Sequence, residues 1–150
     1  MPYNEPPLAI DDVNSGVINN TVSGNVLVND SDPNGNTITA SLVTSPAVGS
    51  VILTGNGTYT YTPPTGFVGN IVFTYQVCDN GVPGPLCDTA NVFISIIDPA
   101  LGNDAPVAAN DQGVTLTDVP VSGNLLNNDY DPDGDNLTVN TTPVTTPTNG

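Results

Sequence analysis

The chain has 150 residues and a net charge of −15, because fourteen Asp and one Glu are balanced by no Lys, Arg or His. Without basic side chains the protein has no phosphate clamp, no nucleic-acid surface and no attraction to anionic membranes. The absence of His and Lys also removes most acid–base and Schiff-base chemistry, so we expect no enzyme activity. Leu, Ile, Val and Phe account for 40 of the 150 residues, which is enough to form a hydrophobic core.

Short runs rich in Val, Ile, Thr and Tyr predict strands at residues 10–18, 21–28, 37–44, 50–54, 58–62, 70–78 and 89–97. No segment has a helical period. In the last two runs alternate residues are apolar and should face inward, namely Ile71, Phe73, Tyr75, Val77, Val92, Ile94 and Ile96. Seven short strands in this length predict an all-β fold, a seven-stranded antiparallel immunoglobulin-like β-sandwich.

An internal repeat organises the chain. Residues 7–39 align without a gap to residues 106–138, with 14 identities in 33 positions. We therefore predict a complete repeat at 1–98, a linker at 99–104 and the first half of a second repeat at 105–150. The second repeat lacks counterparts of residues 50–97, so we do not expect it to close a sandwich alone. Either the array continues, or another subunit donates strands and builds a filament.

Two segments resemble the cadherin-like, immunoglobulin-like tandem repeats of giant bacterial surface adhesins: APVAANDQGVTLTDVPVSGNLLNNDYDPDGDNLTV and GTYTYTPPTGFVGNIVFTYQVCDNGVPGPLCDTANVFISI. The cysteine-containing version is similar to repeats from large surface proteins of Bacteroidetes, including gliding-motility adhesins. The resemblance implies an extracellular location, cadherin-like modules in tandem and calcium at the junctions between modules.

Two acidic loops are candidate calcium sites. Asp129, Asp131, Asp133 and Asp135 alternate around a Gly, and the first repeat has the counterparts Asp30, Asp32 and Asn34. Alternate oxygen side chains around a tight turn can wrap a cation that needs six to eight oxygen ligands. No Glu follows at position 12 of either loop, which rules out an EF-hand. The alternative is that Asp-Pro-Asp-Gly is simply a favourable turn sequence.

Further calcium ligands are expected from the linker, because the sandwich topology brings the linker and the acidic loop to the same pole. The linker motif Asn-Asp-Ala-Pro resembles the calcium-binding linker of cadherins. Its candidate ligands are Asp98, Asn103 and Asp104, and a solvated polar linker is the alternative. Asp11, Asp12 and Asp111 are additional candidates that could equally be outward-facing strand residues.

The only two cysteines, Cys78 and Cys87, flank a predicted hairpin loop. Such flanks come within disulfide reach, so we predict a bond between them and an oxidising compartment. Two free buried thiols are the alternative.

The sequence predicts a structural segment of an extracellular adhesin or filament at the cell surface, stiffened by calcium at its repeat junctions. Its expected partners are neighbouring repeats or identical subunits end to end, together with a surface or glycan ligand. Nucleic acid binding and membrane insertion are not expected. The alternative function is a carbohydrate- or partner-binding module of a secreted protein.

Overall fold

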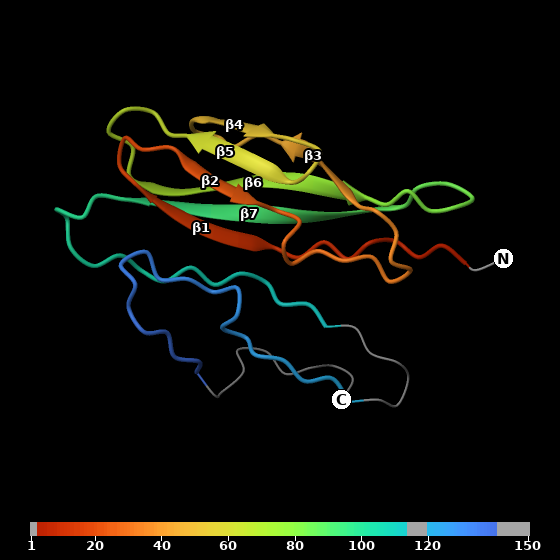
Figure 1. Cartoon of the computed structure of the whole chain (residues 1–150). Helices are drawn as coiled ribbons and strands as arrows, with labels where there is room; N and C mark the ends of the chain where they lie inside the picture. Colours follow the sequence, from red (N-terminus) through yellow and green to blue (C-terminus); the bar gives the residue numbers. More distant parts are fainter. Residues whose placement is uncertain (1–2, 114–119, 141–150) are drawn as a thin grey trace.

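The first repeat forms a two-layer β-sandwich in the computed structural model, which describes residues 3–113 and 120–140. Each predicted strand of this repeat overlaps one observed strand (Figure 1). In chain order they are β1 (Asp12–Val17), β2 (Val22–Asn25), β3 (Thr39–Thr44), β4 (Ser50–Leu53), β5 (Thr58–Thr62), β6 (Gly69–Cys78) and β7 (Cys87–Ile97). The all-β, immunoglobulin-like prediction is therefore confirmed.

The strands divide into a four-stranded sheet of order β1-β7-β6-β3 and a three-stranded sheet of order β2-β5-β4. Neighbouring strands are antiparallel, as predicted, except that β1 runs parallel to β7 with Asp12 opposite Val92. The parallel pair has a simple topological cause. Both strands begin at the pole that holds the N-terminal segment and the β6–β7 loop, so they leave this pole in the same direction.

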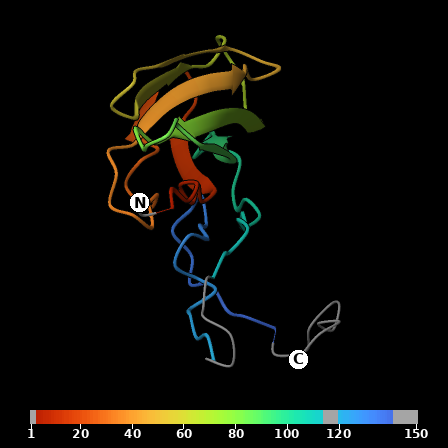
Figure 2. The same cartoon turned by 90° about the vertical axis from the view of Figure 1, so that its right-hand side faces the viewer.

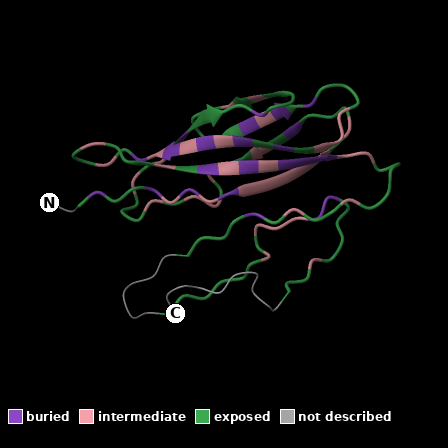
Figure 3. Ribbon diagram, turned by 180° about the vertical axis from the view of Figure 1, so that it is seen from behind, coloured by how far each residue is buried: buried purple, intermediate pink, exposed green. Residues whose placement is uncertain are grey.

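The core lies between the two sheets and is filled by alternate residues of the central strands (Figure 3). All seven residues predicted to face inward from β6 and β7 are buried. Tyr59 and Tyr61 of β5 complete the core from the opposite sheet. Tyr59 packs edge-to-face on Phe73, with ring centroids 5.3 Å apart and planes at 68°, a geometry that aromatic pairs prefer.

A tight glycine turn shapes the end of β2, which is shorter than predicted. Asn25 Oδ1 accepts a hydrogen bond from Leu27 N at 2.9 Å and turns the chain out of the sheet. Val26 N then donates to Gly57 O at 3.0 Å. Gly57 has a φ of +85°, and a Cβ there would collide with the Asn25 side chain. Glycine is therefore required at this position.

Residues 105–113 and 120–140 run beside the first repeat, on the side of β1 (Figures 1 and 2). Val107 and Tyr130 form an isolated antiparallel bridge that matches the Leu8–Ser31 bridge of the first repeat. Within these described ranges no strand forms beyond this bridge, although the sequence predicted counterparts of the first three strands. The backbone here has no counterparts of β5, β6 and β7 to pair with. The predicted strands extend into residues 114–119 and 141–150, which lie outside the described residues.

Candidate functional site

The acidic loop of the first repeat is a turn organised by one carboxylate. Asp32 Oδ1 accepts hydrogen bonds from the backbone amides of Asn34 and Asn36, both at 2.9 Å. Gly35 N donates to Asp32 O at 3.0 Å, which closes the turn. Asn34 Oδ1 in turn accepts from Glu5 N at 2.7 Å. We call this arrangement the Asp turn; it ties the loop to the N-terminal segment.

The second repeat builds the same Asp turn. Asp131 Oδ1 accepts from the backbone amides of Asp133 and Asp135 at 3.0 and 3.1 Å. Gly134 N donates to Asp131 O at 3.0 Å. The Asp133 carboxylate accepts from Asp104 N, just as Asn34 accepts from Glu5. The turn thus forms in residues 103–135 without a surrounding sandwich, so its cause is local: an Asp that caps two amides beside a glycine.

One oxygen of the central carboxylate in each Asp turn is committed to the backbone of that turn. The inner oxygen of each turn is occupied by two amides, and Asp32 Oδ2 is buried without a hydrogen-bond partner. Among the described residues, no group of three or more His, Cys, Asp or Glu side chains is arranged to hold a metal ion. Asp133 and Asp135 are exposed, so a cation at this turn would have to gather them by side-chain rotation.

The linker residues differ in whether they contact the Asp turn of the second repeat. Asp104 contacts the Asp turn of the second repeat through its backbone amide, which donates to the Asp133 carboxylate. Asp98 instead caps its own turn, with Oδ1 accepting from Ala100 N at 3.0 Å, and Asn103 donates to Asp104 O. Asp129 Oδ1 accepts from Ala109 N at 3.0 Å and so holds the N-terminal segment of its repeat. The calcium set as a whole stays a prediction.

Three carboxylates gather where the segment before β1 crosses the β2–β3 loop, and we call them the carboxylate cluster: Asp11, Asp12 and Asp30. Asp30 Oδ1 accepts from Ile10 N at 2.8 Å, and the Tyr75 hydroxyl lies 3.1 Å from Asp30 Oδ2. Tyr75 Oη also lies 3.0 Å from Ile10 O. Asp11 is only 5% exposed and accepts from Asn91 N at 2.8 Å. Asp11 is therefore not an outward-facing strand residue.

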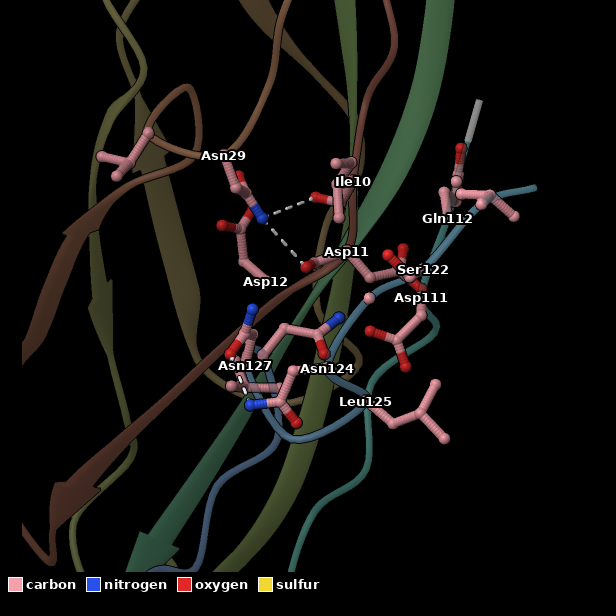
Figure 4. A pocket seen from close by; sticks show the side chains of 16 residues that line it. Ile10, Asp11, Asp12, Asn29, Asp111, Gln112, Ser122, Asn124, Leu125 and Asn127 are labelled. Atoms are coloured by element: carbon pink, nitrogen blue, oxygen red, sulfur yellow. Dashed lines mark hydrogen bonds between the residues drawn. The ribbon is translucent and has the colours of Figure 1, made fainter. Parts of the chain in front are cut away.

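Asp12 is the least satisfied member of the carboxylate cluster. Its Oδ2 atom is buried without a hydrogen-bond partner, and so is Oδ1 of the neighbouring Asn29 (Figure 4). Burial, together with the charges of Asp30 and Asp11, raises the pKa of Asp12 to about 7, although hydrogen bonding to Tyr75 and Asn29 opposes the rise. Burial likewise raises the pKa of Asp30 to about 6. A proton on Asp12 would turn one of its carboxylate oxygens from an acceptor into a donor.

Tyr75 connects the carboxylate cluster to the core, and the sequence indicated only its inward direction. Its hydroxyl reaches the carbonyls of Ile10 and Val26, which lie in distant segments of the chain. Burial, followed by the charges of Asp12 and Asp30, raises the pKa of the Tyr75 hydroxyl. It therefore stays protonated and acts as a hydrogen-bond donor to the cluster.

The Cys78–Cys87 disulfide is confirmed, and it closes the β6–β7 hairpin where these two residues face each other. The loop that it closes meets the N-terminal segment. Asn4 is 7% exposed and donates to both Asp79 carboxylate oxygens at 3.2 and 3.3 Å. Burial would raise the pKa of Asp79, but the amides of Gly81 and Leu86 and the Asn4 side chain lower it. Asn4 was not singled out from the sequence, although Asn103 is its aligned counterpart.

A cavity of about 600 Å³ is lined on one side by the carboxylate cluster and on the other by the second repeat (Figure 4). One wall is formed by Asp11, Asp12 and Asn29, and the other includes Asp111 and Leu125. Burial, followed by the charge of Asp129, raises the pKa of Asp111. Asp12 and Asp111 are equivalent residues of the two repeats, so equivalent surfaces face the same space.

These features define a class of protein: an immunoglobulin-like β-sandwich module followed by a partial second repeat, with an Asp turn in each copy. The chain belongs to the bacterial Ig domain family, because the sequence model of that family matches residues 4–95 and 103–150. No curated protein matches the chain.

Two solved structures show limited likeness to the chain. One is the endo-fucoidan hydrolase MfFcnA4 of glycoside hydrolase family 107, with 21% identity, a TM-score of 0.46 and coverage of 69% of this chain. The other is a point variant of that enzyme, with 17% identity, a TM-score of 0.47 and coverage of 61%. The matched regions are only 16% and 14% of the two enzyme chains. At these scores the likeness carries no functional argument.

Proposed function

We propose that the chain is a structural tandem-repeat segment of an extracellular bacterial adhesin or filament, in which calcium stiffens the junctions between repeats. The observation that carries the proposal is the duplicated Asp turn. In each copy the turn is hydrogen-bonded to the backbone of the segment that enters the repeat, through Glu5 in one and Asp104 in the other. A linker held in this way transmits orientation from one module to the next.

Two further features support this role. The Cys78–Cys87 disulfide is typical of proteins that function outside the reducing cytosol. The net charge of −15 without a single basic side chain favours association with dissolved cations, and exposed Asp133 and Asp135 beside Asp104 offer hard oxygen ligands of the kind that calcium prefers.

The chain offers a matched test for calcium, because the first-repeat Asp turn carries Asn34 and Asn36 where the second carries Asp133 and Asp135. The double variant Asp133→Asn, Asp135→Asn should therefore keep the turn but lose charged ligands. We expect calcium titration by calorimetry to show binding to the original chain and at least tenfold weaker binding to the variant. Asn136→Thr, which places the first-repeat residue outside the turn, is the control.

The mechanical role is tested by the shape of the chain in solution. Small-angle scattering in calcium should give a narrower distribution of overall dimensions than scattering in chelator, and the double Asn substitution should abolish this difference. If calcium changes neither binding heat nor dimensions, and a glycan array instead retains the chain, the binding-module alternative replaces the structural one.

A further inference from the structure

Among the described residues, three side-chain hydrogen bonds join the second repeat to the flank of β1. Asn110 Nδ2 donates to Asp11 Oδ2 at 3.0 Å, and Gln112 Nε2 donates to Ala9 O at 3.2 Å. Ser15 Oγ donates to Tyr130 Oη at 2.6 Å. The partners of the first two bonds run in opposite order along the chain, so the entering segments of the two repeats lie antiparallel. Figure 1 shows residues 105–113 doubling back beside β1.

Each of the three residues that make this contact from the second repeat differs from its counterpart in the first. The aligned counterparts of Asn110, Gln112 and Tyr130 are an acidic residue, an apolar residue and a small hydroxyl residue, namely Asp11, Val13 and Ser31. By contrast, the two carboxylates that cap backbone amides in each repeat are identical, namely Asp32 and Asp131 in the turn and Asp30 and Asp129 at the entering segment. The contact is therefore an addition to the common architecture of the repeat.

Charge explains why it matters that the second repeat carries Asn110 where the first carries Asp11. Asp11 is 5% exposed, and its Oδ1 is held by the backbone and side-chain amides of Asn91 at 2.8 and 3.3 Å. Its Oδ2 faces Asn110. A repeat with Asp at that position would bring two carboxylates together, with no basic side chain in the chain to compensate. An amide instead supplies a charge-assisted hydrogen bond.

Gln112 and Tyr130 differ from their counterparts in hydrogen-bonding capacity and in side-chain length. Val in place of Gln112 could not donate to the Ala9 carbonyl, and Ser in place of Tyr130 is too short to meet Ser15. A cavity of about 600 Å³ lies beside these bonds. The three polar contacts are therefore the interactions through which the β1 flank can distinguish one repeat from another.

We propose that the β1 flank, formed by Ala9, Asp11 and Ser15, is a docking surface for the entering segment of the following repeat in the same chain. The surface selects a repeat that carries Asn, Gln and Tyr at the positions of Asn110, Gln112 and Tyr130. A following repeat that carries Asp at the position of Asn110, as the first repeat does at Asp11, is rejected because the two carboxylates repel each other. The contact folds the second repeat back beside the first and so limits the angle of the junction. It forms without calcium, and calcium at the Asp turn would narrow the remaining range of angles.

Distance measurement between spin labels tests the proposal on the full 150-residue chain in chelator, so that no divalent cation bridges carboxylates. Ile52→Cys and Val139→Cys provide label sites away from the contact, 71% and 45% exposed, while the native cysteines are bonded. We expect one narrow distance for the original chain. Asn110→Asp should remove at least nine-tenths of that population. The reversal Asp11→Asn with Asn110→Asp should restore it, because the amide and the carboxylate merely exchange sides.

Controls separate docking from folding. The single variant Asp11→Asn should keep the narrow distance, since its oxygen can still accept from Asn91 and its amide can pair with Asn110. Asn136→Thr should also leave it unchanged. Melting of each variant reports whether the first sandwich is intact. The proposal is wrong if Asn110→Asp keeps the narrow distance, if the reversal fails to restore it in a folded chain, or if the distance arises only between labels on separate chains.

Discussion

Replacing Asp12 by Asn should stabilise the first repeat at neutral pH. Asp12 Oδ2 is a buried oxygen without a donor, and Oδ1 of Asn29 beside it also lacks one. The substitution Asp12→Asn removes the charge from this site. The new side-chain amide also adds a donor, from which Asn29 Oδ1 can accept a hydrogen bond. This outcome is opposite to the one expected if Asp12 is a ligand of a bound calcium ion.

The magnitude follows from the pKa. Burial raises the pKa of Asp12 from 3.8 to about 7, and this difference corresponds to about 4 kcal/mol as an upper limit. Solvent screening at this partly buried position reduces the expected effect to about 2 kcal/mol. Because the folded state binds the proton more tightly than the unfolded state, the stabilisation by protonated Asp12 is complete below about pH 4. It is lost as the pH rises through about 7.

Urea unfolding between about pH 4 and about pH 8.5 in chelator measures this contribution. The original chain should lose about 2 kcal/mol of stability from Asp12 across this range, on top of smaller losses from Asp30, whose pKa is raised to about 6. Asp12→Asn should flatten the curve and be the more stable protein at the alkaline end. Asp111→Asn, the aligned exposed residue, is the matched control. A variant that is less stable at that end, or has an unchanged pH slope, would refute the reasoning.

Three other predictions concern the same framework. Tyr75→Phe should cost about 1–3 kcal/mol, because it removes the donor to buried acceptors around Ile10 and Asp30; chemical unfolding measures it, and an unchanged midpoint would contradict it. Reducing Cys78–Cys87 should cost about 2.7 kcal/mol by loop entropy without unfolding the sandwich, which hydrogen exchange checks; global loss of protection would contradict it. Calcium at about a hundred times its dissociation constant should add about 2.7 kcal/mol; equal melting temperatures in calcium and chelator would exclude this.

Much of the first repeat could be predicted because its information is local. Alternating apolar residues such as Phe73 and Tyr75 indicate an inward face wherever the strand lies. The Asp turn was also recognisable, since Asp32 acts on amides two and four residues away. Its chemistry was ambiguous, however, because the oxygen spacing that suits a cation also suits a turn that caps its own backbone.

The sequence by itself determined the strands, their inward faces, the repeat and the two residues of the disulfide, because these depend on neighbours along the chain. Only the tertiary structure decided that Asp12 and Asp30 share a buried site with Tyr75, which lies 45 residues from Asp30. It also decided that β1 runs parallel to β7 and that Asn110 docks on Asp11. These outcomes depend on burial and on contacts between distant segments. The sequence shows that a residue is aspartate, but it does not show whether the carboxylate lies in water or in the interior.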